Sequence, residues 1–335
     1  MNIEIRRITK AEIEDYERLV HTSNEGTIFH ESWWLDTFKK VYRHGYSVQY
    51  IGLFQEPNLL AAIPIPVHRR IGINFIHNPK LTPYLGPMFS QELLKGKRVS
   101  HISKQKEANS LFAKVLKKSG LVLYYPFSLG HIDLQPYKWT GFKIGVHYTY
   151  TIDLNQPLEE IWAEMDKRRR NEIRKVDSLN PEIAKDELKS FITLNEMSFK
   201  RQRKKYNLKK FWKMLFEECS KRGQCKVWTA YIKEEPVASV FLVWDNRRAY
   251  YLGGGIKDNS HGTMSLLLWK AIKFSKKRGL KIFDFEGSDV PSIEKYFREF
   301  GGKIQPVYYI EHNSIKTNLM LNLYFYLKEK NIKFE

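Results

Sequence analysis

Residues 249–287 read AYYLGGGIKDNSHGTMSLLLWKAIKFSKKRGLKIFDFEG. Short apolar runs at 249–253 and 281–285 are typical of buried strands. Between them, apolar side chains recur at helical spacing, at Met264, Leu267, Leu268, Ala271 and Ile272. Gly279 follows as a residue that commonly ends a helix. The segment therefore predicts a strand, an amphipathic helix and a second strand.

The elements on either side of this segment follow an order that occurs once in each half of the chain. In the first half we expect a strand at 3–8, helices at 10–20, 32–42 and 109–119, and strands at 47–55, 59–68, 121–127 and 146–154. In the second half we expect helices at 158–177, 185–199, 208–222 and 292–300, and strands at 226–232, 238–244 and 305–310. The halves share little sequence identity, so the repeat is one of architecture.

Length and composition agree with a repeated architecture. A chain of 335 residues suits two domains better than one, and 42% hydrophobic residues suffice for two cores. We expect an α+β fold with domains at 1–145 and 146–335, each containing a mixed, mostly antiparallel sheet flanked by helices.

Charge and cysteine usage narrow the function classes. The net charge of +19 is spread over both halves and favours polyanionic partners such as RNA, nucleotide-linked substrates or an anionic membrane surface. The two cysteines, Cys219 and Cys225, exclude a disulfide framework and fit a reducing cytoplasm. We expect no metal site. The N-terminus alternates charged and apolar residues, unlike a signal peptide, and no apolar run is long enough to span a bilayer. These features predict a cytoplasmic protein.

Several motifs, taken together in their order and spacing, resemble the Fem-type peptidoglycan aminoacyltransferases and related double-domain N-acyltransferases. They are Phe29-His-Glu-Ser-Trp33, Leu81-Thr-Pro-Tyr-Leu-Gly-Pro87, Trp139-Thr-Gly-Phe142, Tyr148-Thr-Tyr150, Lys167-Arg-Arg-Arg-Asn-Glu-Ile-Arg-Lys175, Phe199-Lys-Arg-Gln202, Tyr250-Tyr-Leu-Gly-Gly-Gly255, Phe283-Asp-Phe-Glu-Gly287 and Tyr296-Phe-Arg-Glu-Phe-Gly-Gly302. The long helical hairpin arm of some members is missing, as in the compact members.

This resemblance implies two tandem N-acetyltransferase-like (GNAT) domains that share a cleft. It also implies acyl or aminoacyl transfer to an amine of an anionic cell-envelope or polysaccharide precursor. The donor would be an aminoacyl-tRNA or an acyl-CoA, with no permanently bound cofactor. One alternative is an acyl-CoA-dependent N-acetyltransferase that modifies an amino sugar. Another is a non-catalytic RNA-binding protein that uses the fold as a basic platform.

Three carboxylates lie at or just after the end of the strand at 281–285 and are candidates for accepting the proton of the attacking amine. Strand alternation puts Asp284 and Glu286 on one face, and Asp289 lies just beyond. The competing interpretation is a structural carboxylate that pairs with an arginine or caps the next helix. No Ser/His/Asp or Cys/His grouping supports a covalent acyl-enzyme, so we expect direct attack of the amine on the bound donor.

Residues 259–265 occupy the place where acetyltransferases bind a pyrophosphate at the start of a helix. The usual glycine-rich pattern is degraded: Gly262 is kept with Thr263 beside it, but Met264 replaces the second small residue. We expect Gly262 and Thr263 to contact donor phosphate, and the degraded pattern to weaken binding of free coenzyme A. An ordinary capped helix is the competing interpretation.

The remaining candidates for substrate binding are basic or aromatic: Trp33, Tyr84, Arg169, Arg174, Arg201, Tyr206, Tyr251 and Arg298. Arginine suits bidentate recognition of phosphate, although charge runs such as 167–175 and 200–205 are commonly solvated helix faces. The C-terminal segment 318–327 is strongly apolar and aromatic. It either completes the core of the second domain or contacts a membrane interface near a lipid-linked precursor.

Overall fold

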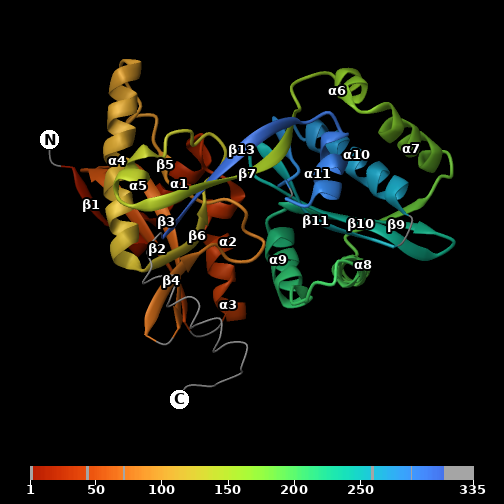
Figure 1. Cartoon of the computed structure of the whole chain (residues 1–335), viewed down its shortest axis with the longest axis horizontal. Coiled ribbons are helices and arrows are strands. Elements are labelled where there is room, and N and C mark those ends of the chain that lie inside the picture. The colour runs from red at the N-terminus through yellow and green to blue at the C-terminus, as the bar shows by residue number, and fades with distance from the viewer. Residues whose placement is uncertain (1–2, 43–44, 71, 258–259, 288, 313–335) are drawn as a thin grey trace. The chain divides into compact units, whose positions relative to one another are not determined.

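The computed structural model describes residues 3–42, 45–70, 72–257, 260–287 and 289–312 (Figure 1). The expected C-terminal helix lies outside the described residues. The chain divides into two compact units. Unit 1 contains the described residues up to Val146 and those from Val307 to His312, and unit 2 contains His147–Pro306. Each unit is described by itself.

Unit 1 is built on a sheet in the order β1-β2-β3-β4-β6-β13, with β5 paired to β3. Its neighbours are antiparallel except β4 and β6, which are parallel and joined through helix α4. The elements are β1 (Glu4–Arg7), η1 (Lys10–Glu12), α1 (Ile13–Thr22), η2 (Ile28–His30), α2 (Ser32–Thr37), α3 (Lys39–Tyr42), β2 (Tyr46–Gln55), β3 (Asn58–Arg70), β4 (Ile73–His77), β5 (Met88–Phe89), α4 (Arg98–Ser119), β6 (Leu121–Pro126), α5 (Gln135–Trp139), β7 (Phe142–Asp153) and β13 (Lys303–His312).

Unit 2 repeats this topology with the order β7-β12-β11-β10-β9-β8. Again one neighbouring pair, β11 and β12, is parallel and is joined through a helix, α10. The elements are α6 (Leu158–Glu164), α7 (Lys167–Asp177), β8 (Glu182–Lys185), α8 (Leu188–Arg201), α9 (Lys209–Lys221), β9 (Cys225–Ile232), β10 (Glu235–Trp244), β11 (Arg248–Ile256), α10 (His261–Lys277), β12 (Ile282–Asp284) and α11 (Pro291–Arg298). The expected α+β fold of two similar sheet-and-helix domains is confirmed. Strands β7 and β13 each begin in one unit and end in the other.

The sheet of unit 2 carries helices on both faces. Alternation along β10 sends Val240 and Leu242 into a core with Leu267 and Leu268 of α10. Phe241, between them, points to the other face, where its ring lies 5.2 Å from Trp212 of α9. Figure 1 shows α8 and α9 on one side of β9–β11 and α6, α7, α10 and α11 on the other. A sheet buried on both faces explains the nearly continuous apolar run of β10.

Helix boundaries differ from the expectation at two places that matter below. Helix α4 begins at Arg98, eleven residues before the expected start. The sequence did not predict this first half because it lacks a sustained apolar periodicity. The expected helix at 158–177 is two helices, α6 and α7. The break lies where Asp166 caps α7, and the Asp166 amide donates to the Glu299 carbonyl at 2.9 Å.

Candidate functional site

Strands β11 and β12 part within unit 2. They pair over three positions only, ending at Tyr250 and Asp284, while β11 continues to Ile256. A bulge interrupts the pairing of β11 with β10 between Tyr251 and Gly253, opposite Leu242 and Phe241. A bulge re-aims the side chains beside it. The parted strand ends therefore leave space next to Tyr251.

A cavity of about 330 Å³ lies at this point. It is lined by the end of α8, the last half of β11, the first turn of α10 and the inner face of α11: Ser198, Arg201, Gln202, Tyr251, Gly254, Gly255, Ile256, Met264, Ser292, Ile293, Tyr296 and Phe297. Its wall is mainly apolar, with a few polar groups at one side, which is the usual character of a small-molecule site.

Gly254 helps to keep this cavity open. A Cβ atom built there would collide with the Tyr251 hydroxyl and lie 3.1 Å from Met264 Cε. The Gly254 carbonyl accepts a hydrogen bond from Asn195 Nδ2 at 2.7 Å. Trp212 Nε1 in turn donates to Asn195 Oδ1 at 3.0 Å, so the backbone of β11 is held from the α8 side.

Two carboxylates lie at the end of β12. Asp284 is fully buried; its Oδ1 accepts from Thr149 Oγ1 at 2.7 Å and from the Glu286 amide at 2.8 Å. Glu286 keeps some exposed surface as a residue, but its Oε1 is sealed from solvent and has no hydrogen-bond partner among the described residues. Burial, and secondly the charge of Asp284, raise the pKa of Glu286 well above its ordinary value.

Glu286 is electrostatically coupled to the cavity wall through Tyr251. Burial is the main cause that raises the pKa of the Tyr251 hydroxyl, followed by Tyr296 and then by the charge of Glu286. A phenol in this environment keeps its proton at neutral pH. The cavity therefore has a neutral hydroxyl in its wall, and the charge of Glu286, a carboxylate of raised basicity, acts on that hydroxyl.

The end of α8 forms the polar side of the cavity. Arg201 donates through Nη2 to the Ile256 carbonyl at 2.5 Å, and Ser198 Oγ accepts from the Ile256 amide at 3.1 Å. Tyr206 lies beyond this helix end with its ring 5.4 Å from Phe199. Burial, with a smaller effect of Glu196, raises the pKa of Tyr206 to about 12. Arg201 and Tyr251 are thus the two candidates for substrate binding that line the cavity.

Arg169 lies elsewhere in unit 2 and is engaged within the protein. Its side chain is buried and makes ion pairs of 2.5 Å with both Glu172 and Glu299. It also donates to Ser265 Oγ at 2.9 Å and lies 4.1 Å above the Tyr296 ring. This environment suits a residue that ties α7 to α10 and α11.

The two candidates for donor phosphate lie in the first turn of α10. Gly262 faces α7, where an added Cβ would lie 2.9 Å from Val176 Cγ2, and Thr263 is buried. Close packing against α7 is therefore one reason for a glycine at position 262.

The remaining candidates are not among the residues that line the cavity. Asp289 is exposed and pairs with His147 Nδ1 at 2.8 Å. Arg298 is exposed and pairs with Glu294 at 3.0 Å, whereas Arg174 is exposed on α7 with its guanidinium 5.5 Å from the Trp162 ring. Trp33 and Tyr84 belong to unit 1. Tyr84 is buried there, edge-on to Phe29.

Sequence reasoning missed the contribution of α11 to the cavity. Ile293, Tyr296 and Phe297 recur at helical spacing and form the inner face of α11. That spacing could have predicted one apolar face on this helix, because it separates these side chains from Arg298, which lies on the outer face. Gly254 and Gly255 were visible only as part of a motif.

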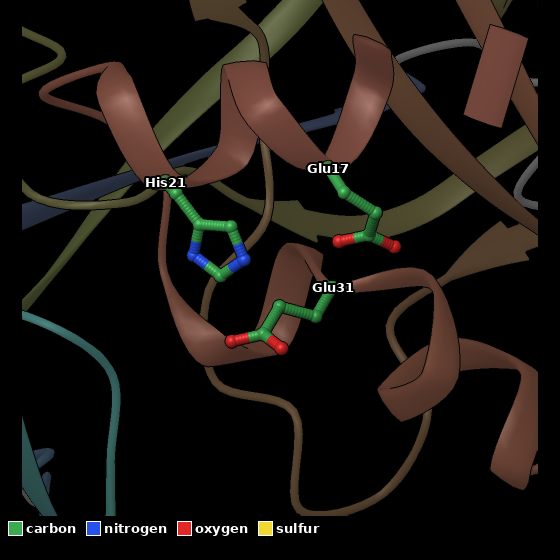
Figure 2. Close-up of side chains that lie close together, drawn as sticks. All are labelled: Glu17, His21 and Glu31. Carbon is green, nitrogen blue, oxygen red and sulfur yellow. The ribbon is translucent and has the colours of Figure 1, made fainter. Parts of the chain in front are cut away.

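Unit 1 contains the one group among the described residues whose ligand atoms could meet on a metal ion. Glu17, His21 and Glu31 place their nearest carboxylate or imidazole atoms within 4.8 Å of one another. Figure 2 shows Glu17 and His21 pointing from the same helix toward Glu31. Trp33 Nε1 donates to Glu31, and the Ser32 amide donates to Glu17 at 2.8 Å. These hydrogen bonds also hold Glu17 and Glu31 in place without a metal.

Comparison with known proteins agrees with this geometry. Residues 164–298 match a family model described as an acetyltransferase (GNAT) domain, which covers most of unit 2 and its cavity. No curated protein matches the chain. None of the helices in the described part of the chain combines the length and apolar character that crossing a bilayer requires.

Solved structures extend the likeness to the whole chain. FemX is similar with a TM-score of 0.70 at 11% identity, covering 91% of this chain and 96% of its own. L-PGS from Bacillus licheniformis is similar with a TM-score of 0.52 at 11% identity, covering 94% and 96%. A tandem GNAT protein from the clavulanic acid biosynthesis pathway is similar with a TM-score of 0.51 at 9% identity, covering 92% and 98%. The chain has a tandem GNAT fold like that of FemX, and residues 164–298 of its second unit match a GNAT acetyltransferase domain.

Proposed function

We propose that unit 2 transfers an acyl or aminoacyl group to an amine of an anionic cell-envelope or polysaccharide precursor. The observation that carries this proposal is Glu286, a carboxylate of raised pKa coupled to the tyrosine in the wall of the cavity. Such a group at the parted ends of two parallel strands suits proton transfer from an attacking amine.

The reaction requires little from the protein besides positioning and proton transfer. The amine nitrogen attacks the acyl carbonyl carbon, the new C–N bond forms, and the C–S or C–O bond to the donor breaks. Glu286, in its ionised form, takes the proton that the nitrogen loses. An ordinary carboxylate is a weak base toward an ammonium group, and the raised pKa of Glu286 reduces that mismatch.

Two donor classes remain, each favoured by one observation. The match of residues 164–298 to an acetyltransferase domain favours an acyl-CoA. The replacement of the second small residue by Met264, together with the tandem fold shared with FemX, favours an aminoacyl-tRNA. Both donors and the proposed precursors are made in the cytoplasm, where we place the reaction.

The acceptor is proposed to be anionic because the polar side of the cavity is cationic. Arg201 lines the cavity, and the chain around it, Lys200-Arg-Gln-Arg-Lys-Lys205, is largely exposed. Phosphate groups on an amino-sugar or lipid-linked precursor are the partners that such a segment attracts. The alternative function, acyl-CoA-dependent N-acetylation of an amino sugar, differs from this proposal only in the donor and in the size of the acceptor.

The test offers the purified protein a panel of acyl-CoA thioesters and aminoacyl-tRNAs, with glucosamine 6-phosphate as a probe amine, and detects the amide product by mass spectrometry. Glu286→Gln should lower kcat by at least about 100-fold, the usual contribution of a general base. Glu234→Gln, which changes an exposed carboxylate in the β9–β10 turn, should leave kcat unchanged. Full activity of Glu286→Gln would remove the proposed role of Glu286. Product from acyl-CoA alone would select the acyl-CoA class.

A further inference from the structure

The first half of α4 exposes large apolar side chains. Val99 is 70% exposed and Ile102 is 42% exposed. They lie three residues apart, so they share one face of the helix, and Lys106 continues that face one turn later. Figure 1 shows α4 along one side of unit 1 with α5 beside it.

The segment before and through α5 extends this apolar surface. Ile132 is 84% exposed and Trp139 is 66% exposed. Lys106 connects the two segments, because its Nζ lies 2.5 Å from both Asp133 Oδ2 and Gln135 Oε1 and 5.1 Å from the centre of the Trp139 ring. We call Val99, Ile102, Ile132 and Trp139 the α4–α5 patch.

The α4–α5 patch stands out from ordinary surface apolar residues. Single exposed apolar side chains are normal, but clusters of them mark interaction sites. Ile132, Val99 and Trp139 are the three most exposed large hydrophobic residues in the described part of the chain. None of the four belongs to the core of unit 1, because the buried residues of α4 begin at Ala108 and include Phe112, Ala113 and Leu116.

Exposed basic residues flank the α4–α5 patch in sequence. They are Lys95, Lys97, Arg98 and Lys138. The nearby acidic residues are fewer: Glu92 and Glu107 are exposed, and Asp133 is paired with Lys106. Exposed aliphatic and tryptophan side chains flanked by exposed basic residues match a membrane interface with anionic headgroups.

We propose that the α4–α5 patch binds the surface of an anionic lipid bilayer, with Ile132, Val99, Ile102 and Trp139 at headgroup depth and the lysines above lipid phosphate. Three of the four side chains are aliphatic, which favours lipid over RNA, since single-stranded RNA is held by stacking on aromatic rings. The contact is peripheral and independent of the acyl-transfer site in unit 2. It would hold the protein next to a membrane-borne partner.

The experiment measures co-sedimentation of the full chain with vesicles of phosphatidylcholine alone and with about 30% phosphatidylglycerol. The wild type should sediment with the anionic vesicles only, and about 0.5 M NaCl should release most of it. Ile102→Ser with Ile132→Ser should weaken binding by at least about tenfold, because both side chains leave the interface. Leu179→Ser with Ile304→Ser, an equally exposed apolar pair in unit 2, should bind like the wild type.

Equal melting temperatures of the two double variants and the wild type establish that folding is unchanged. Sedimentation of Ile102→Ser/Ile132→Ser equal to that of the wild type would overturn the proposal, as would no binding of the wild type to anionic vesicles. Filter binding of mixed tRNA is measured in parallel. Loss of tRNA binding in that variant, with vesicle binding kept, would assign the patch to RNA instead.

Discussion

Glu286 shows how one residue's backbone places its side chain. Its φ is +58°, in the left-handed region that residues other than glycine rarely adopt, and Gly287 follows with φ +68°. A Cβ at Gly287 would collide with the Tyr148 carbonyl, so only glycine fits there. The chain turns sharply as soon as β12 ends, and this turn places Oε1 of Glu286 where solvent does not reach it. The expected strand alternation stops at Asp284, where β12 ends.

Glu286→Gln should change the pH dependence of stability. The folded protein raises the pKa of Glu286 above the ordinary value of 4.5, so between these two values the folded state holds a proton that the unfolded state has lost. The free energy of unfolding therefore falls as pH rises through this window. Gln stays neutral and removes that decline. Urea titrations from acid to neutral pH should show a flatter profile for Glu286→Gln; a parallel profile would mean that Glu286 is solvated.

Arg169 and Arg174 provide a matched pair of arginines on α7. Arg169→Ala should destabilise the protein by about 3–5 kcal/mol, because it leaves Glu172 and Glu299 without their buried cation. Arg174→Ala, on the exposed face, should stay within about 0.5 kcal/mol of the wild type. Urea unfolding measures both. Wild-type stability of Arg169→Ala with weaker tRNA or coenzyme A binding would restore Arg169 to the role of phosphate ligand.

At the scale of helices and strands, the sequence predicted the elements that have a periodic apolar pattern. It missed the elements that lack such a pattern or are held by tertiary contacts. The amphipathic pattern at Leu267 and Leu268 predicted α10 because that helix packs one face on the sheet. The start of α4 at Arg98 was missed because exposed residues need no apolar period. Strand β8 was missed because four residues, none of them fully buried, are held in place by pairing with β9.

The candidate site follows the same rule. Glu286 and Tyr251 were candidates because a carboxylate just after a strand and an aromatic residue within a strand are visible in sequence. The cavity itself was not, because it depends on where β11 and β12 part and on the absence of a side chain at Gly254. Neither the extent of strand pairing nor the open space can be read from local composition.

The break between α6 and α7 rests on one capping residue. Asp166 Oδ1 accepts from the Arg168 amide at 2.8 Å, and a carboxylate there also favours the positive end of the helix. Asp166→Ala should lower the free energy of unfolding by about 1 kcal/mol. Asp177→Ala, which removes an exposed carboxylate from the last residue of α7, should have no destabilising effect. Equal losses in denaturant titrations of both variants would contradict the capping role.

At the scale of the whole molecule, a net charge of +19 attracts anionic ligands before any contact forms. The excess of lysine and arginine raises the local concentration of anions around the protein and speeds their association. This effect acts on the encounter between ligand and protein. Its range is short, because charges separated by more than a Debye length of about 8 Å at physiological salt are screened from one another. It should therefore alter substrate capture and leave the proposed chemical step at Glu286 unchanged.

Salt should accordingly separate capture from chemistry. With glucosamine 6-phosphate as acceptor, raising NaCl from about 0.05 to about 0.5 M should increase KM several-fold, because screening weakens the attraction between the cationic protein and the phosphate. The value of kcat should stay constant, since the proposed proton transfer to Glu286 does not depend on the screening of surface charges. Glucosamine, which lacks the phosphate, is the matched control, and its KM should rise far less. Steady-state kinetics with both acceptors at one saturating donor concentration measure the difference. If KM rises equally for the two sugars, the salt acts on the donor or on the fold, and the charge of the acceptor is not what the protein recognises.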